Sequence, residues 1–165
     1  MTQLHDECLP ANERYARGFT KGDLAMPPAR RFAVVTCMDA RLDPAKFLGL
    51  EEGDAHVIRN AGALVTDDAI RSLVISHWLL GTQEFAVIAH TDCGMLTFSN
   101  EDLRQKLQEE AGADASDVDF QPFPELEESV RKGVAKIRRS ALLPDSIPVS
   151  GWVYDVRSGS LAEVA

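Results

Sequence analysis

The sequence predicts an α/β fold: a central, mostly parallel β-sheet flanked by α-helices, with a C-terminal antiparallel strand or hairpin. Continuous apolar runs of strand length recur along the chain, and segments with helical spacing and helix caps alternate with them. The last two runs flank a short Ser-Gly-Ser turn. With 165 residues, of which 45% are hydrophobic and 26% charged, the chain is long enough for one core. We therefore expect residues 1–165 to form a single domain.

Residues 1–31 are expected to form an N-terminal helical arm and loop. Within them, residues 4–19 have the pattern of a weak amphipathic helix that is interrupted at Pro10, because proline lacks the N–H that a helix interior needs. Glycines and the Pro27-Pro28 pair then indicate a loop.

Three apolar runs predict buried strands, at residues 32–36, 55–59 and 85–90. Runs such as Phe-Ala-Val-Val-Thr are continuous rather than alternating, which is typical of strands covered on both faces. Connections long enough for crossover helices separate the three runs, so the strands are expected to be parallel.

Helices are expected between and after these strands. Asp43 followed by Pro44 is a helix start, and the short helix should end near Gly49. Three further helices are expected. The first spans residues 68–80, with a cap at Thr66 or Asp67; the second begins at Asn100; the third spans residues 125–141.

The C-terminal part combines a loop and a hairpin. Residues 111–124 are acidic and contain prolines, which predicts a loop and the best candidate for a mobile segment. Residues 149–156 and 161–164 flank the turn at 157–160, so an antiparallel pair is expected there.

The net charge of the chain disfavours two classes of binding partner. Seventeen basic and 26 acidic residues give a net charge of −9, which argues against a nucleic-acid backbone or an anionic membrane as partner. No apolar stretch is long enough to span a bilayer, and the first thirty residues lack the apolar core of a signal peptide. We expect a cytoplasmic protein, in which three cysteines favour ligands or nucleophiles over a disulfide.

Two short clusters carry the chemistry of this chain. Cys37, Asp39 and Arg41 follow the first strand, and the third strand ends at His90, with Cys93 three residues later. Two thiolates and one imidazole make a three-ligand zinc site whose free fourth position distinguishes a catalytic zinc from a structural one. If the backbone stays extended past the first strand, its three clustered side chains project to the same side. Both clusters then lie at carboxyl ends of strands, where open α/β sheets bind their ligands.

Each residue alone has a simpler explanation. A single buried cysteine is most often structural, and Asp39 with Arg41 alone would be a surface ion pair. Cys8 has no ligand-type neighbours and is expected to be an ordinary free thiol. No catalytic role is assigned to His5, His56 or His77. The Arg-Asn-Ala-Gly run at 59–62 is either turn chemistry or part of a pocket wall.

Together the motifs resemble those of β-class carbonic anhydrases, in particular the compact prokaryotic branch. Cys-x-Asp-x-Arg at 37–41, Arg-Asn-Ala-Gly at 59–62 and His-x-x-Cys-Gly at 90–94 stand in the order of that family. The resemblance implies one zinc ion per chain, held by Cys37, His90 and Cys93, with Asp39 and Arg41 as a catalytic dyad. It implies reversible hydration of carbon dioxide to bicarbonate by hydroxide on the zinc. It also implies a homodimer or dimer of dimers in which the N-terminal helix lies across the partner subunit.

Family members also include forms in which the aspartate of this motif closes the metal site at low pH. Breaking of the Asp39–Arg41 contact would free the carboxylate to occupy the fourth zinc position. The inhibitory site of such members uses a tryptophan upstream of the first ligand, whereas both tryptophans here, Trp78 and Trp152, lie downstream of Cys37. We therefore expect the open form at neutral pH.

Other functions remain consistent with the same motifs. A hydrolase of carbonyl sulfide or carbon disulfide on the same fold would share the zinc ligands and differ in access to the pocket. A non-catalytic zinc-binding domain would be expected to lack Asp39 or Arg41, and both are present. A redox role for Cys37 and Cys93 is disfavoured because no Cys-x-x-Cys spacing occurs.

Overall fold

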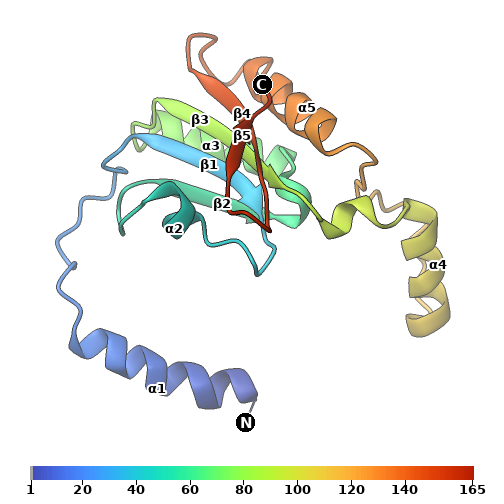
Figure 1. Cartoon of the computed structure of the whole chain (residues 1–165), viewed down its shortest axis with the longest axis horizontal. Helices are drawn as coiled ribbons and strands as arrows, with labels where there is room; N and C mark the ends of the chain where they lie inside the picture. Colours follow the sequence, from blue (N-terminus) through green and yellow to red (C-terminus); the bar gives the residue numbers. More distant parts are fainter. Residues whose placement is uncertain (1) are drawn as a thin grey trace.

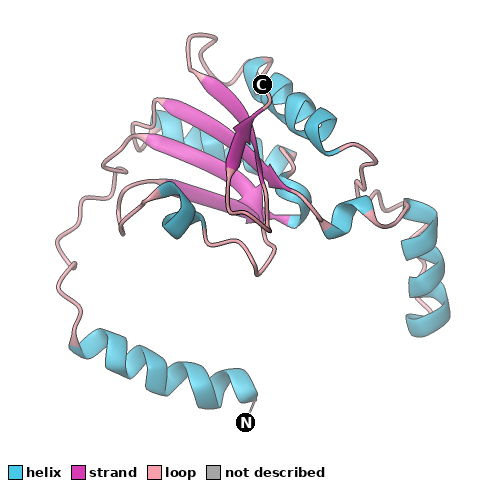
Figure 2. Cartoon of the chain, in the orientation of Figure 1, coloured by secondary structure: helices cyan, strands magenta, loops and turns pink. Residues whose placement is uncertain are grey.

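The computed structural model describes residues 2–165 and shows one five-stranded sheet with helices on both faces (Figures 1 and 2). The strand order is β2-β1-β3-β4-β5; the first four strands are parallel and β5 runs antiparallel to β4. The expected fold class is therefore confirmed. The strands are β1 (Phe32–Cys37), β2 (His56–Asn60), β3 (Glu84–His90), β4 (Val149–Tyr154) and β5 (Leu161–Glu163).

The helices begin where the cap residues predict. Asp43 accepts a hydrogen bond from the Lys46 N–H, and Thr66 accepts one from the Ala69 N–H. Two helices end two to three residues earlier than expected, at Trp78 and Arg138. The helices are α1 (Gln3–Arg17), α2 (Pro44–Leu48), α3 (Asp67–Trp78), α4 (Asn100–Ala111) and α5 (Leu126–Arg138), with 3-10 turns η1 (Ala61–Ala63) and η2 (Gly94–Leu96).

The main core lies between the sheet and the helices α3 and α5. Leu73 of α3 and Phe85 of β3 are fully buried, and Val130 and Val134 of α5 are 1% exposed. Gly151 of β4 allows α5 to approach the sheet, because a Cβ there would stand 2.6 Å from the nearest methyl of Val130. Close packing on this face fixes the strands whose carboxyl ends carry the two motifs.

The expected interruption of the first helix at Pro10 is wrong. α1 runs without a break from Gln3 to Arg17, with Pro10 inside it. Proline removes one backbone hydrogen bond of the helix, and the bonds on either side hold the remaining turns together. Met1, the first residue of the expected arm, lies outside the described residues.

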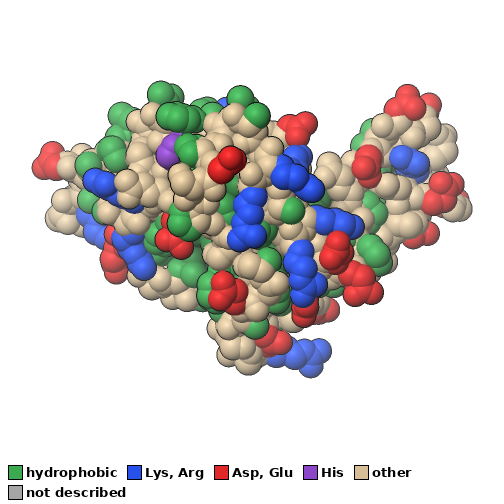
Figure 3. Space-filling view, turned by 90° about the horizontal axis from the view of Figure 1, so that it is seen from above, with side chains coloured by type: hydrophobic (Ala, Val, Ile, Leu, Met, Phe, Trp, Pro, Cys, Tyr) green, Lys and Arg blue, Asp and Glu red, His purple; other side chains and the backbone are tan. Residues whose placement is uncertain are grey.

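Two helices project from the body of the molecule. Figure 1 shows α1 and α4 standing away from the sheet on opposite sides, and α4 forms the charged lobe at the right of Figure 3. The accessible surface is 10441 Å², against about 8,100 Å² for a compact monomer of this mass. The excess reflects these projections. No helix in the described part of the chain is long and apolar enough to cross a membrane.

Candidate metal centre

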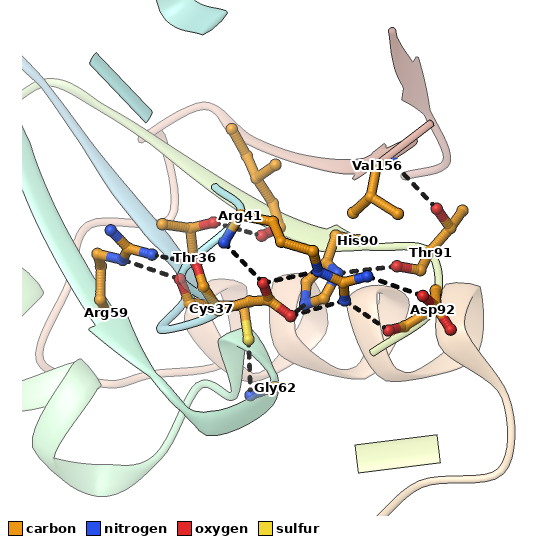
Figure 4. Close-up of polar contacts among 11 residues, drawn as sticks. Thr36, Cys37, Arg41, Arg59, Gly62, His90, Thr91, Asp92 and Val156 are labelled. Carbon is orange, nitrogen blue, oxygen red and sulfur yellow. Dashed lines mark hydrogen bonds and ion pairs between the residues drawn. The ribbon is translucent and has the colours of Figure 1, made fainter. Parts of the chain in front are cut away.

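The two motifs meet at the carboxyl ends of neighbouring strands. Cys37 is the last residue of β1 and His90 is the last residue of β3, and these strands are parallel neighbours. The Thr36 hydroxyl donates to the Ile88 carbonyl at 2.8 Å, which ties the two strand ends together (Figure 4). Cys93 follows three residues after His90, as the N-cap of η2. The expected meeting of the clusters at one edge of the sheet is therefore seen in the structure.

Cys37, His90 and Cys93 form a buried group of metal-type ligands. One ligand atom from each residue lies within 4.8 Å of the others, and the three residues are 4%, 0% and 3% exposed. A tetrahedral zinc ion holds sulfur and nitrogen ligands about 3.5 to 3.8 Å apart, so small side-chain adjustments would bring these atoms to bonding distance. The donor set of two sulfurs and one imidazole suits zinc.

The histidine ring is oriented as a metal ligand requires. Its Nδ1 lies 2.8 Å from the Thr91 carbonyl, to which it must donate because a carbonyl oxygen only accepts. The lone pair is thereby left on Nε2. Among the residues that the structure describes, His90 Nε2 is a buried side-chain nitrogen without a hydrogen-bond partner. A buried orphan acceptor beside two thiols fits a metal ligand, and the Thr91 carbonyl supplies the outer contact that fixes the tautomer.

The two thiols are inequivalent without a metal. Contact with Cys93, assisted by the Gly62 N–H, lowers the pKa of the Cys37 thiol from its usual value. The same contact raises the pKa of the Cys93 thiol above its usual value, with burial adding to the effect. A divalent cation bound at this group would favour the ionised form of both sulfurs.

Asp39 is held by Arg41 through a two-pronged contact. Arg41 Nε donates to Asp39 Oδ1 at 3.0 Å and Arg41 Nη2 donates to Oδ2 at 2.8 Å. Hydrogen bonding from the guanidinium holds the pKa of the Asp39 carboxyl well below its usual range. Asp39 Oδ2 also lies 3.7 Å from His90 Nε2, next to the ligand group. This paired carboxylate is the arrangement that the open form requires.

The backbone does not stay extended past the first strand, so the condition for the three side chains of the first motif to project to the same side is not met. β1 ends at Cys37, and the Leu42 N–H donates to the Asp39 carbonyl in a turn. The Asp39 carboxylate also accepts from the backbone N–H of Arg41, and this local bond competes with extension. The turn, rather than alternation along a strand, therefore brings the two charged side chains together.

Arg41 also reaches the second motif, which the sequence did not indicate. Its Nη1 donates to the Asp92 carboxylate at 2.7 Å, and its Nη2 donates to the Asp92 carbonyl at 2.8 Å (Figure 4). Asp92 stands between the candidate ligands His90 and Cys93. The sequence showed a carboxylate, Asp92, within the second motif. Its contact with Arg41 could not be predicted from the sequence, because it depends on β1 and β3 being neighbours.

The Arg-Asn-Ala-Gly run supports the first motif as well as making a turn. Arg59 donates to the carbonyls of Cys37 at 2.9 Å and Asp39 at 2.7 Å. The Asn60 side chain closes the turn through both the N–H and the carbonyl of Leu64. Gly62, with φ of 82°, directs its N–H to the Cys37 sulfur at 3.4 Å. The turn interpretation of this run is therefore confirmed, and its contacts to the Cys37 and Asp39 backbone are a further finding.

The remaining cysteine and histidines lie outside the ligand group. Cys8 is exposed on α1. His56 contacts the Ser76 hydroxyl at 2.7 Å, and His77 contacts the Thr82 carbonyl at 2.7 Å. His5 lies beside Asp6 on the surface of α1. These contacts account for the three histidines without a role at the metal centre.

Comparisons with known proteins cover the same region. The carbonic anhydrase family model matches residues 32–161. Over 159 residues, 96% of each chain, the sequence is 47% identical to β-carbonic anhydrase 1 of Mycobacterium tuberculosis. The crystal structure of a carbonic anhydrase from Streptococcus mutans matches with a TM-score of 0.96 at 47% identity, covering 100% of this chain and 99% of that one. A carbon disulfide hydrolase from Acidithiobacillus thiooxidans is 34% identical over 90% of this chain and 84% of that protein.

Proposed function

This chain belongs to the β-carbonic anhydrase family, and from that premise we propose that Cys37, His90 and Cys93 bind one zinc ion beside a catalytic pair, Asp39 and Arg41. The reaction is the reversible hydration of carbon dioxide to bicarbonate and a proton, and the enzyme is a lyase of the carbonate dehydratase type. The observation that carries the site assignment is the buried, unpartnered Nε2 of His90 beside two cysteine thiols.

Zinc, when bound, supplies a Lewis acid that lowers the pKa of water toward neutrality and so provides the nucleophile for carbon dioxide. The chain's own part begins with the charge of the ligands. Two thiolates cancel the formal charge of the ion, which weakens its effect on water compared with three neutral histidines. The residues around the ligands must therefore contribute to activation of the water.

Asp39 is placed to make that contribution. Its Oδ2, 3.7 Å from His90 Nε2, is positioned to accept a hydrogen bond from the attacking water and to orient a lone pair toward the substrate carbon. Arg41 holds both carboxylate oxygens, keeps the group ionised and fixes it at its place beside the ligand atoms. The Arg59 contacts to the Cys37 and Asp39 carbonyls fix the backbone on which these groups stand.

The substrate is tested by two assays on the zinc-loaded enzyme. We expect rapid carbon dioxide hydration by stopped-flow, with little hydrogen sulfide release from carbon disulfide or carbonyl sulfide. The similarity to carbon disulfide hydrolases makes the second assay necessary, because the two activities share their ligand motif. Sulfide release without carbon dioxide hydration would favour the hydrolase, and absence of both activities from fully loaded protein would favour a non-catalytic zinc domain.

The projecting first helix supports a homodimer, alone or within a dimer of dimers. Leu4, Cys8, Ala11 and Tyr15 recur at helical spacing along one side of α1, and Leu4 and Tyr15 are 71% and 53% exposed. A groove of about 480 Å³ lies over β1, β3 and β4, lined by Phe32, Val34, Ile88, Trp152 and other residues. The excess surface of about 2,300 Å² per chain is of the size that obligate dimers bury. We propose that the arm, residues 1–31, covers this groove on the partner subunit.

Deletion of residues 1–18 is expected to convert the dimer into a monomer, because it removes the apolar side of α1 while leaving the sheet core intact. Light scattering after gel filtration measures the mass, and near-ultraviolet circular dichroism checks that the core is folded. Val118→Asp, which places a charge on an exposed apolar side chain elsewhere, should remain dimeric. A folded deletion variant that is still dimeric would contradict the proposal.

A further inference from the structure

The Arg41 guanidinium bridges the two loops that carry the candidate ligands. It donates to Asp39 through Nε and Nη2, and to Asp92 through Nη1 and Nη2, at distances from 2.7 to 3.0 Å. Asp39 lies on the loop after β1, and Asp92 lies on the loop after β3, between two candidate ligands. The orientation of Arg41 is thus set from both loops at once.

The backbone at Asp92 is shaped for this contact. Its φ of 56° is in the left-handed region, which aspartate and asparagine tolerate better than most residues. In that conformation both the carboxylate and the carbonyl of Asp92 face the guanidinium. A non-glycine residue in such a conformation beside a ligand group is the kind of local strain that accompanies a functional constraint.

The second contact changes what the Asp39–Arg41 pair can do. The Arg41 side chain is 47% exposed, and an exposed ion pair with one partner is held weakly because long side chains retain many rotamers. With contacts to Asp92 as well, four of the five guanidinium N–H groups have acceptors. The orientation of the Arg41 guanidinium relative to the Asp39 carboxylate is then set by Asp92 as well as by Asp39.

We propose that Asp92 is a positioning residue, which holds the Arg41 guanidinium in the orientation that aligns the Asp39 carboxylate for catalysis. This inference rests on the proposed function of the site. Asp92 does not itself act on the substrate, and its effect passes through Arg41 to Asp39. It therefore predicts that the effect of losing Asp92 depends on whether Asp39 is present.

Asp92→Gly tests the proposal, because glycine accepts the left-handed backbone and removes the side chain with its carboxylate, while the backbone carbonyl that also contacts Arg41 remains. In zinc-loaded enzyme we expect kcat for carbon dioxide hydration to fall about tenfold, with KM little changed, as for other losses of groups that orient a site. Asp92→Asn keeps an oxygen acceptor for Nη1 and should recover part of that loss. In an Asp39→Ala background, Asp92→Gly should cause no further loss.

Nitrogen NMR of the Arg41 guanidinium gives a readout that does not depend on activity. Arg41→Lys assigns the signals. We expect distinct, slowly exchanging Nη resonances in the wild type and averaged ones in Asp92→Gly, with or without zinc.

The outcomes separate this inference from the proposed function. An inactive wild type that contains zinc contradicts the function, whatever the NMR shows. An active wild type with unchanged guanidinium signals and unchanged kcat in Asp92→Gly overturns the positioning role. An equal loss of activity in both Asp39 backgrounds also overturns it, since that result indicates general damage to the loop.

Discussion

Cys37→Ser is expected to abolish zinc binding and, with it, carbon dioxide hydration. A serine hydroxyl does not ionise near neutral pH and is a poor ligand for zinc, so two donors would remain of the three in this group. Loss of a group that only orients a ligand costs about 10–100-fold in metal affinity, and loss of the ligand itself should exceed that range. The Gly62 N–H, which donates to the Cys37 sulfur, would also lose a strong acceptor.

The measurement is zinc content by elemental analysis after dialysis, paired with the stopped-flow rate of the same preparation. Cys8→Ala is the matched control, because it removes a cysteine that lies far from the ligand group in sequence and leaves a small apolar residue on the side of α1 that we assign to the dimer. It should retain one zinc per chain and full activity. A Cys37→Ser protein that keeps its zinc and hydrates carbon dioxide at the wild-type rate would show that the metal centre has been assigned to the wrong residues.

The sheet could be predicted from the sequence because its strands are marked by local composition. The continuous apolar run from Phe32 and the run that ends at His90 predicted two buried strands of a parallel sheet. Asp43 and Thr66 marked helix starts through hydrogen bonds to nearby backbone groups, which are local interactions. The prediction of a break at Pro10 was wrong because it used the local effect of proline alone. Proline is unfavourable inside a helix, but the backbone hydrogen bonds on either side of it hold α1 together.

The contacts around the candidate ligands were harder to predict because they join segments far apart in sequence. Cys37 and His90 could be expected at one edge of the sheet, but the strand order that makes β1 and β3 neighbours could not be deduced from composition. Asp92 contacts Arg41 only because of that order. The Arg59 contacts likewise follow from the pairing of β1 with β2.

Asp39→Ala is expected to keep zinc and to lose most of the activity. The three candidate ligands are untouched by the substitution, whereas the water loses the acceptor that we assign to Asp39. Removal of a positioned acid–base group typically costs about 10²- to 10⁴-fold, and we expect the fall in kcat to lie in this range. Arg41 would keep its contacts to Asp92, so the loop after β3 should stay in place.

The combination of zinc content and rate decides the role of this carboxylate. Asp117→Ala removes an exposed carboxylate in the loop before α5 and should change neither quantity. Asp39→Asn provides the closer comparison, because the amide keeps the size of the side chain and loses its charge, and with it the strong pull on Arg41. If Asp39 orients the water through its negative oxygens, both Asp39 variants should be slow while fully loaded with zinc. Full activity in either variant would remove Asp39 from the mechanism, and loss of zinc from Asp39→Asn would instead make it a support of the ligands.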